Sequence, residues 1–151
     1  MIECTITDIT VDSQYQDTVY TQTVTANLDG VIVHLFDGAS PVTTDDLIGK
    51  TVDVQLIAQA RSIDRADDTE PGIEKRTDDD YTLVGVIDDA EQTAVEEYPP
   101  ILVDVGVGKL SVEVTPAIEE QLVEQSIKPA DTVIVTAYRL DLVEVSIPNG
   151  R

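Results

Sequence analysis

The sequence predicts a mainly β fold with one short helix. β-Branched residues are abundant, since 21 of the 151 residues are Val and 17 are Thr, and such residues favour strands. Apolar and polar residues alternate in several runs, as in residues 2–6, which is typical of strands that bury one face. Asp29-Gly30 separates two such runs and supplies the positive φ angles of a type I′ turn, so it predicts a hairpin.

The first half of the chain contains four predicted strands. Residues 2–7 alternate in hydropathy, and a change of phase at Asp8 predicts a β-bulge before the strand continues. Residues 18–36 form the predicted hairpin around Asp29-Gly30. Residues 41–49 are rich in turn formers and predict at most one helical turn, and a further strand is expected over residues 52–63.

The second half repeats this order. Residues 81–87 read as a strand, and residues 101–114 as a hairpin around Gly108-Lys109, a predicted type II′ turn. Thr115 is a predicted helix N-cap, with Pro116 at the first helical position and acidic residues in the first turn. We therefore expect a helix over residues 116–127, followed by a long strand or a bent pair of strands over residues 132–147.

These elements suggest a division of the chain into two β halves. The predicted parts are residues 1–63, an acidic exposed loop or linker at 64–80, a second β half with the helix at 81–147, and a tail at 148–151. Each half reads as strand, hairpin, short helix or turn, and long strand. One barrel domain over 1–147 and two tandem barrels both fit this order.

The segments that lead into the last strand of each half carry a resemblance. They read Leu-Ile-Gly-Lys-Thr-Val-Asp-Val at 47–54 and Ile-Lys-Pro-Ala-Asp-Thr-Val-Ile-Val at 127–135. With the order of elements, they resemble the OB-fold, a small Greek-key barrel of five strands. The second segment departs from the pattern, because Ala130 stands where a glycine is usual. A fifth strand in each half requires the long strands to bend near Ala60 and Leu140, and an eight-stranded barrel is the alternative.

The charge of the chain indicates the salt conditions under which the protein is stable. It has 30 acidic and 9 basic residues, a formal charge of −21. Such a charge opposes a compact state by self-repulsion, and molar salt, with a Debye length of about 3 Å, removes most of that repulsion. The composition resembles that of proteins from salt-in halophiles, particularly halophilic archaea. An acidic protein that binds basic partners is the alternative interpretation.

Targeting and membrane signals are not visible in the sequence. No run approaches 18 apolar residues, and the first residues lack the pattern of a signal peptide. We expect a cytoplasmic protein with no membrane contact.

Few residues are suited to catalysis or metal binding. A single cysteine, Cys4, and a single histidine, His34, exclude Cys-based and His-pair metal motifs, and no metal, cofactor or catalytic residue is predicted. Cys4 is expected to be buried, and His34 to be partly buried and hydrogen-bonded. Acidic pairs such as Asp88-Asp89 are frequent, but neighbours on a strand point to opposite faces. A small hydrolase that uses convergent carboxylates is therefore the weakest hypothesis.

Nucleic-acid binding is the stronger alternative, since OB-folds often bind single strands. Basic residues gather in the central segment, and Tyr81 follows them. In a nucleic-acid protein of OB type, the backbone contacts would be Arg61, Arg65 and Arg76, and the stacking platform would be Tyr81 or Tyr138. Interleaved acids and few aromatic residues disfavour this hypothesis. The preferred function is a non-enzymatic binding or assembly module whose partner is another protein or a second copy.

Overall fold

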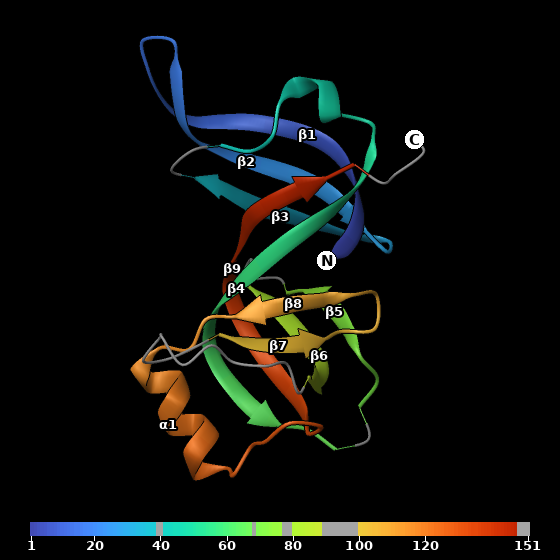
Figure 1. Cartoon of the computed structure of the whole chain (residues 1–151), viewed down its shortest axis with the longest axis vertical. Coiled ribbons are helices and arrows are strands. Elements are labelled where there is room, and N and C mark those ends of the chain that lie inside the picture. The colour runs from blue at the N-terminus through green and yellow to red at the C-terminus, as the bar shows by residue number, and fades with distance from the viewer. Residues whose placement is uncertain (39–40, 68, 77–79, 89–99, 148–151) are drawn as a thin grey trace. The chain divides into compact units, whose positions relative to one another are not determined.

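The structure, a computed structural model, describes residues 1–38, 41–67, 69–76, 80–88 and 100–147. These residues form nine strands, one 3₁₀ turn and one α-helix (Figure 1). The prediction of a mainly β, barrel-like fold with one short helix is confirmed. The elements are β1 Ile2–Tyr15, β2 Thr18–Leu28, β3 Val31–Gly38, η1 Asp45–Leu47, β4 Thr51–Arg65, β5 Gly72–Lys75, β6 Tyr81–Ile87, β7 Ile101–Asp104, β8 Lys109–Val112, α1 Pro116–Glu124 and β9 Thr132–Ser146.

The chain forms two compact units. Unit 1 comprises Met1–Ile57 and Leu140–Arg151, and unit 2 comprises Ala58–Arg139. The two longest strands, β4 and β9, each contribute residues to both units. Residues 64–80, expected as an exposed loop, include the end of β4 and the strand β5, which pairs with β6 in unit 2.

The strands of unit 1 form a closed ring in the order β1-β2-β3-β9-β4, with β4 paired back to β1. The β3–β9 pair is parallel, and β1 pairs antiparallel with both β2 and β4. This is a five-stranded Greek-key barrel of OB type. The β1–β2 ladder shifts register between Ile6 and Asp8, which confirms the predicted bulge. Asp29 and Gly30 have φ angles of 50° and 87°, as the predicted hairpin turn requires.

The strands of unit 2 form a second ring, β6-β7-β8-β4-β9, in which β9 pairs back to β6 and β5 extends β6. The hairpin turn predicted at Gly108-Lys109 is at a different position in the structure. Lys109 already pairs with Asp104 across the β7–β8 ladder, and the chain turns through residues 105–108. Gly106, with a φ of 94°, takes the left-handed conformation that this longer turn needs.

The long strand β9 supplies the fifth strand of the ring in unit 1, and the long strand β4 supplies that of unit 2. Along each of these two strands, the side that is buried changes once. In β9 the buried positions run Val133, Val135 and Ala137, and then resume at Leu140. In β4 the buried alternation through Ala58 resumes at Ile63. Both changes lie close to the bends expected at Ala60 and Leu140, so the same strand presents an apolar face to the interior of each unit in turn.

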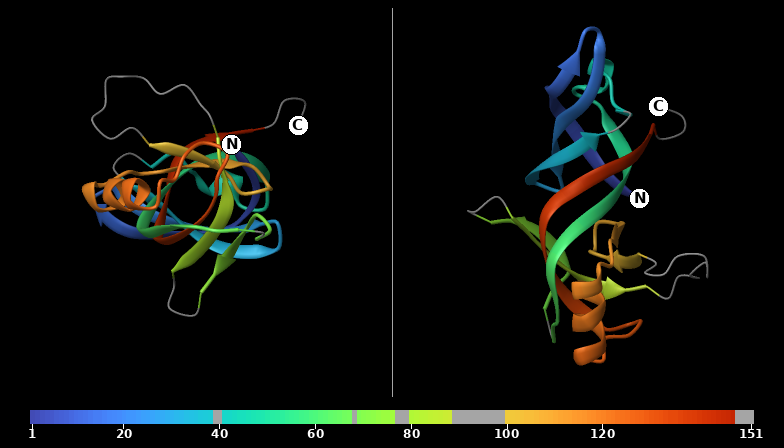
Figure 2. Two further views of the ribbon diagram at one scale, coloured as in Figure 1. Left: turned by 90° about the horizontal axis from the view of Figure 1, so that it is seen from below. Right: turned by 90° about the vertical axis from the view of Figure 1, so that its left-hand side faces the viewer.

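Helix α1 begins as expected and ends early. The Thr115 hydroxyl accepts a hydrogen bond from the amide of Ile118 (3.3 Å), and Pro116 is the first helical residue. The helix ends at Glu124, three residues before the predicted end, because Ser126 has a φ of 53°. Buried Ile118 anchors the helix, which lies beside the end of β4 in unit 2 (Figure 2).

Side chains of α1 close the edge of β4. The side-chain oxygen of Gln121 accepts a hydrogen bond from the backbone amide of Ile63 (2.8 Å). The side-chain oxygen of Gln125, the residue that follows α1, accepts one from the backbone amide of Arg65 (2.8 Å). The Gln125 amide also donates to the carbonyl oxygen of Ile63 (3.1 Å). Two glutamines thereby satisfy backbone groups that a further strand would otherwise satisfy.

Candidate functional site

Arg61 and Tyr138, two of the residues predicted for nucleic-acid binding, meet on the surface of unit 2. The guanidinium carbon of Arg61, on β4, lies 5.0 Å from the centre of the Tyr138 ring on β9. The Arg61 Nε also donates to the carboxylate of Asp80 (2.8 Å), which orients the guanidinium. Both side chains remain about half exposed. An arginine held over an accessible aromatic ring provides a cation and a flat apolar face side by side.

Arg65 lies in a different environment. Its guanidinium donates to the carbonyl oxygen of Ser126 (2.8 Å) and to the carboxylate of Asp131 (2.9 Å). The backbone amide of Lys128 also donates to the Asp131 carboxylate (3.0 Å). This hydrogen bond and, to a smaller extent, the one from Arg65 hold the pKa of Asp131 below its usual value. Arg65 therefore fastens the segment after α1 to the end of β4.

The remaining two predicted residues also differ. The backbone amide of Arg76 donates to the carbonyl oxygen of Asp80 (2.7 Å), and its side chain is exposed. Tyr81 is only 3% exposed and belongs to the core of unit 2, so its ring offers no face for stacking. The structure thus brings Arg61 and Tyr138 together and joins the backbone of Arg76 to that of Asp80, whereas Arg65 and Tyr81 have other environments.

Cys4 and His34 are both on strands of unit 1. Cys4 is buried as expected, and burial, with nearby carboxylates, raises the pKa of its thiol to about 11. His34 is exposed, so the expectation of partial burial is wrong: Val33 and Leu35 take the buried face of β3 and leave His34 on the outer one. The expected hydrogen bond is present, between the His34 Nδ1 and the Thr25 hydroxyl (3.2 Å).

The two most buried acidic side chains have different partners. Asp37 accepts hydrogen bonds from the Gln22 amide (3.0 Å), the Thr43 hydroxyl (2.5 Å) and the backbone amide of Val42 (3.0 Å), all uncharged donors. Asp80 is paired with Arg61. Asp88 pairs with Lys109, and Asp89, Asp78 and Asp79 lie outside the described residues. Within the described part of the chain, no three His, Cys, Asp or Glu side chains gather as a metal site would require.

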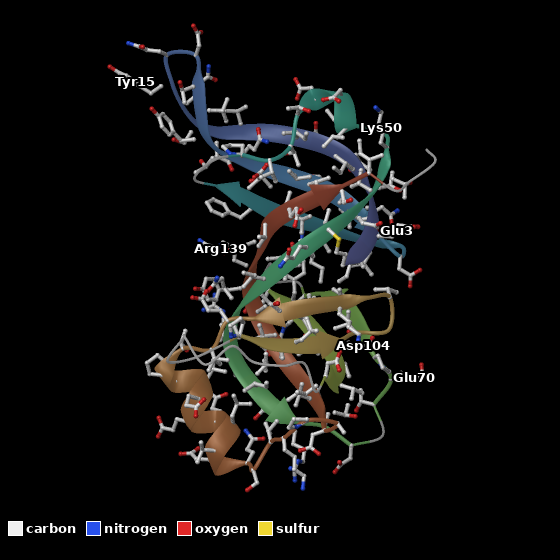
Figure 3. All side chains as sticks on the ribbon, in the orientation of Figure 1. Glu3, Tyr15, Lys50, Glu70, Asp104 and Arg139 are labelled. Atoms are coloured by element: carbon white, nitrogen blue, oxygen red, sulfur yellow. The ribbon has the colours of Figure 1, made fainter. Side chains whose placement is uncertain are left out.

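A second surface, which the sequence analysis missed, lies on the β1–β2 hairpin. We call residues 9–20 of this hairpin the arm. β1 pairs with β4 only through Ile2–Thr5, and β3 pairs with β2 only from Thr21 onward. The first residues of the arm therefore pair with a part of β2 that β3 also joins, and the last ones, Gln14 with Val19 and Tyr15 with Thr18, pair with each other alone. Figure 3 shows Tyr15 at the outer end of this hairpin.

Three large apolar side chains of the arm are exposed. Val11, Tyr15 and Tyr20 are 46%, 67% and 45% exposed, and we call them the apolar residues of the arm. Val11 pairs with Gln22 and Tyr15 pairs with Thr18, and the β1–β2 ladder shifts register twice between these two pairs. The apolar residues therefore lie on an irregular hairpin, where bulges interrupt the alternation of the two strands.

A signal for the arm was present in the sequence. Strand-forming residues are frequent in residues 2–15 and again in residues 18–28, with Gln16-Asp17 between them. This spacing allows two neighbouring strands that are both longer than the other strands predicted in the chain. In addition, the first Lys or Arg of the chain is Lys50.

No family model and no curated protein matches the chain. Among solved structures, it is similar to the cytoplasmic molybdate-binding protein ModG with molybdate bound, with a TM-score of 0.47 and 16% identity over 97% of this chain and 94% of that one. In the described residues, no helix is long and apolar enough to cross a membrane.

Proposed function

We propose that this chain is a non-enzymatic binding or assembly module of the cytoplasm of a halophile, and that it docks a protein partner through the arm. The observation that carries the proposal is the exposure of the apolar residues of the arm. Acidic residues make up 30 of the 151 positions, yet Val11, Tyr15 and Tyr20 are each 45% exposed or more on one hairpin. An exposed apolar patch within a strongly charged surface is typical of a protein-interaction site.

Covalent labelling of tyrosines tests this function without knowledge of the partner. The protein would be labelled in a high-salt extract of the cells that make it, and again after purification and strong dilution in the same salt. We expect Tyr15 and Tyr20 to be protected in the extract and reactive in the dilute sample. Tyr138, also 46% exposed but in unit 2, is the internal control and should react in both. Equal labelling of Tyr15 and Tyr20 in both samples would rule out the proposed function.

A second candidate function, single-stranded nucleic-acid binding, is supported by the Arg61–Tyr138 pair. A base that stacks on Tyr138 would place its phosphate within reach of the Arg61 guanidinium. The net charge of −21 opposes approach of a polyanion in dilute salt, and molar salt removes most of the gain from counterion release. Stacking would therefore have to supply most of the affinity.

Titration with fluorescent single-stranded DNA and RNA at moderate and molar KCl tests this second function. The decisive variants are Arg61→Gln and Tyr138→Ser, and Arg65→Gln is the matched control, because Arg65 binds Asp131 and Ser126 instead. We expect no specific binding in molar salt and a weak signal at moderate salt. Micromolar binding that survives molar salt, is lost in the first two variants and is kept in the control would establish nucleic-acid binding in place of the preferred function.

A further inference from the structure

We propose that one edge of β9 in unit 1 is a site of strand addition, which binds an extended segment of a partner protein with alternating apolar and basic side chains. We call residues 142–146 of β9, on the side of the strand that pairs with β3, the open edge. The site does not involve the arm, so it goes beyond the proposed function. A difference between corresponding strands of the two units points to it.

In unit 2, the edge of β4 beyond β8 is closed by a side-chain amide. Gln125 donates to the carbonyl oxygen of Ile63 (3.1 Å) and accepts from the backbone amide of Arg65 (2.8 Å). A residue of a neighbouring strand likewise donates one hydrogen bond and accepts one. This edge of β4 therefore has backbone groups placed to receive a further strand, and Gln125 takes the position of that strand.

The open edge is the equivalent position in unit 1. The carbonyl oxygen of Ala58, where β4 enters unit 2, accepts from the amide of Glu113 after β8, and Leu140, where β9 enters unit 1, pairs with β3. Ile63 lies five residues after Ala58, and Val145 lies five residues after Leu140. The edge that Gln125 closes in unit 2 thus corresponds to the edge of β9 around Val145.

No strand occupies this position in unit 1. The β3–β9 ladder ends at Asp141, and beyond it β4 is the only strand of the described residues that pairs with β9. The helical element before β4 is the three-residue η1 and not a helix like α1. Val143 and Ile147 are 41% and 52% exposed, and Glu144 and Ser146 are exposed as well. An edge of this kind is a template for another chain.

The row of apolar side chains along the open edge defines one face of the segment. Leu142 is buried, so alternation turns Val143 and Val145 to the outer side of the strand. Ile147, directly after β9, continues this row. Apolar side chains at alternate positions of an added strand would pack beside these residues.

Charge defines the other face of the segment. Glu144 lies between the two outward valines, so its exposed side chain is on the opposite side of the strand. Lys50 is the one Lys or Arg among the described residues of unit 1. A Lys or Arg opposite Glu144 would therefore supply a counter-charge that is scarce in this unit, and opposite charges on neighbouring strands stabilise a sheet.

A second copy of this chain fits the open edge less well. Two copies related by a two-fold axis present the same surface to each other, so β9 would pair with itself. Glu144 is the central residue of the open edge, and it would then lie close to Glu144 of the other copy. Like charges directly opposite destabilise a sheet. A partner with basic side chains avoids this repulsion.

Titration with short fluorescent peptides tests the inference, at the lowest KCl concentration at which circular dichroism shows an intact fold. The probe alternates Val with Lys. One control replaces Lys by Glu, and a second carries N-methyl groups on alternate backbone nitrogens, which removes hydrogen-bond donors and keeps the side chains. We expect the methylated peptide to bind about tenfold more weakly than the probe, and the Glu peptide about threefold more weakly.

Two substitutions separate the open edge from the overall charge. Glu144→Lys in β9 and Glu124→Lys in α1 replace exposed glutamates and change the net charge equally. Glu144→Lys should reverse the order of the Lys and Glu peptides, whereas Glu124→Lys should preserve it. In the wild type, the probe should slow the hydrogen exchange of alternate amides within residues 142–146.

Three outcomes would overturn the inference: no binding of the probe at millimolar concentration, equal binding of the probe and its methylated form, or equal effects of the two substitutions. Protection of residues 142–146 that rises with protein concentration in the absence of peptide would also overturn it, because a second copy would then fill the edge. None of these outcomes depends on the labelling of Tyr15 and Tyr20, so this inference and the proposed function can fail separately.

Discussion

The two units follow one plan and differ in what they add to it. In each, three strands are followed by a helical element and a fourth strand: β1, β2, β3, η1 and β4 in the first series, and β6, β7, β8, α1 and β9 in the second. The helical element is a three-residue turn in unit 1 and a nine-residue helix in unit 2. The first two strands of each series are longer in unit 1, where β1 and β2 have 14 and 11 residues, than in unit 2, where β6 and β7 have 7 and 4.

The comparison separates what the barrel needs from what was added to it. In unit 2, β6 pairs with β9 along Tyr81–Val86, which is nearly its whole length. In unit 1, β1 uses only Ile2–Thr5 to pair with β4. Its next residues, up to Val11, pair with the part of β2 that β3 also joins, and its last residues extend beyond both ladders. The extension of unit 1 is the arm, and that of unit 2 is a helix that covers a strand edge. One extension exposes apolar surface and the other protects a backbone.

Salt should produce the largest difference between the units. Seven of the nine Lys and Arg residues lie in unit 2, and Lys50 and Arg151 are the two in unit 1. Unit 1 has 11 acidic residues and a net charge of −9, and unit 2 has 19 acidic residues and a net charge of −12. Lowering KCl from molar to millimolar concentrations should loosen the fold by increasing self-repulsion, and unit 2, with the larger net charge, should open first. Hydrogen exchange across a KCl series would show this order. A melting temperature that does not change with salt would contradict the halophilic interpretation.

The next effect concerns the two buried carboxylates. Asp37→Ala should lower the free energy of unfolding by about 3 kcal/mol, because it leaves several buried donors, including the Gln22 amide, without an acceptor. Asp80→Ala should cost only about 1 kcal/mol, since its partner Arg61 is largely exposed and water can replace the carboxylate. Urea unfolding of both variants would measure the difference, and equal losses would show that charge pairing matters as much as uncharged donors.

The glutamine contacts of α1 should have an intermediate effect. Gln125→Ala removes hydrogen bonds to the amide of Arg65 and the carbonyl oxygen of Ile63, at a cost of about 1–2 kcal/mol. The exposed neighbour Glu124 provides a matched control, and Glu124→Ala should change stability by less than about 0.5 kcal/mol. Faster amide exchange at Arg65 in the Gln125 variant alone would locate the loss at the β4 edge. Equal stability of both variants would argue against this closure of the edge.

The smallest expected effect concerns Cys4 and appears only at high pH. Its folded pKa of about 11 exceeds the ordinary 9.0, so the unfolded chain loses the thiol proton first. The contribution of the Cys4 thiol to the free energy of unfolding is present in full below pH 9. It is lost as pH rises toward 11, by at most about 2 kcal/mol. The difference between the wild type and Cys4→Ala should shrink over that interval. A constant difference would contradict the raised pKa.

Much of the fold could be predicted because its determinants are local. Asp29-Gly30 fixes a turn through backbone conformation alone, and Thr115-Pro116 marks the start of α1 by capping. The β7–β8 turn was misplaced because two nearby glycines, Gly106 and Gly108, allow more than one loop, and the pairing of Lys109 with Asp104 decides between them.

The candidate site was less predictable, because long-range pairing creates it. Arg61 and Tyr138 are 77 positions apart and meet only because β4 and β9 are neighbours in the sheet. Tyr81 looked similar to Tyr138 in the sequence, but it falls on the buried side of β6. The apolar residues of the arm were not predicted as a surface, because alternation indicates a strand, and only the tertiary structure determines whether other elements cover its side chains.

The parallel pairing of β3 with β9 also bears on how the protein is made. Leu35 of β3 pairs with Leu140 of β9, so the ring of unit 1 joins residues from the beginning and the end of the chain. Contacts so distant in sequence slow folding, because a long loop must close before they form. During translation, β1, β2 and β3 cannot complete this ring until residue 140 has left the ribosome. Premature release or truncation before residue 140 would therefore leave both the first barrel and its apolar interior open.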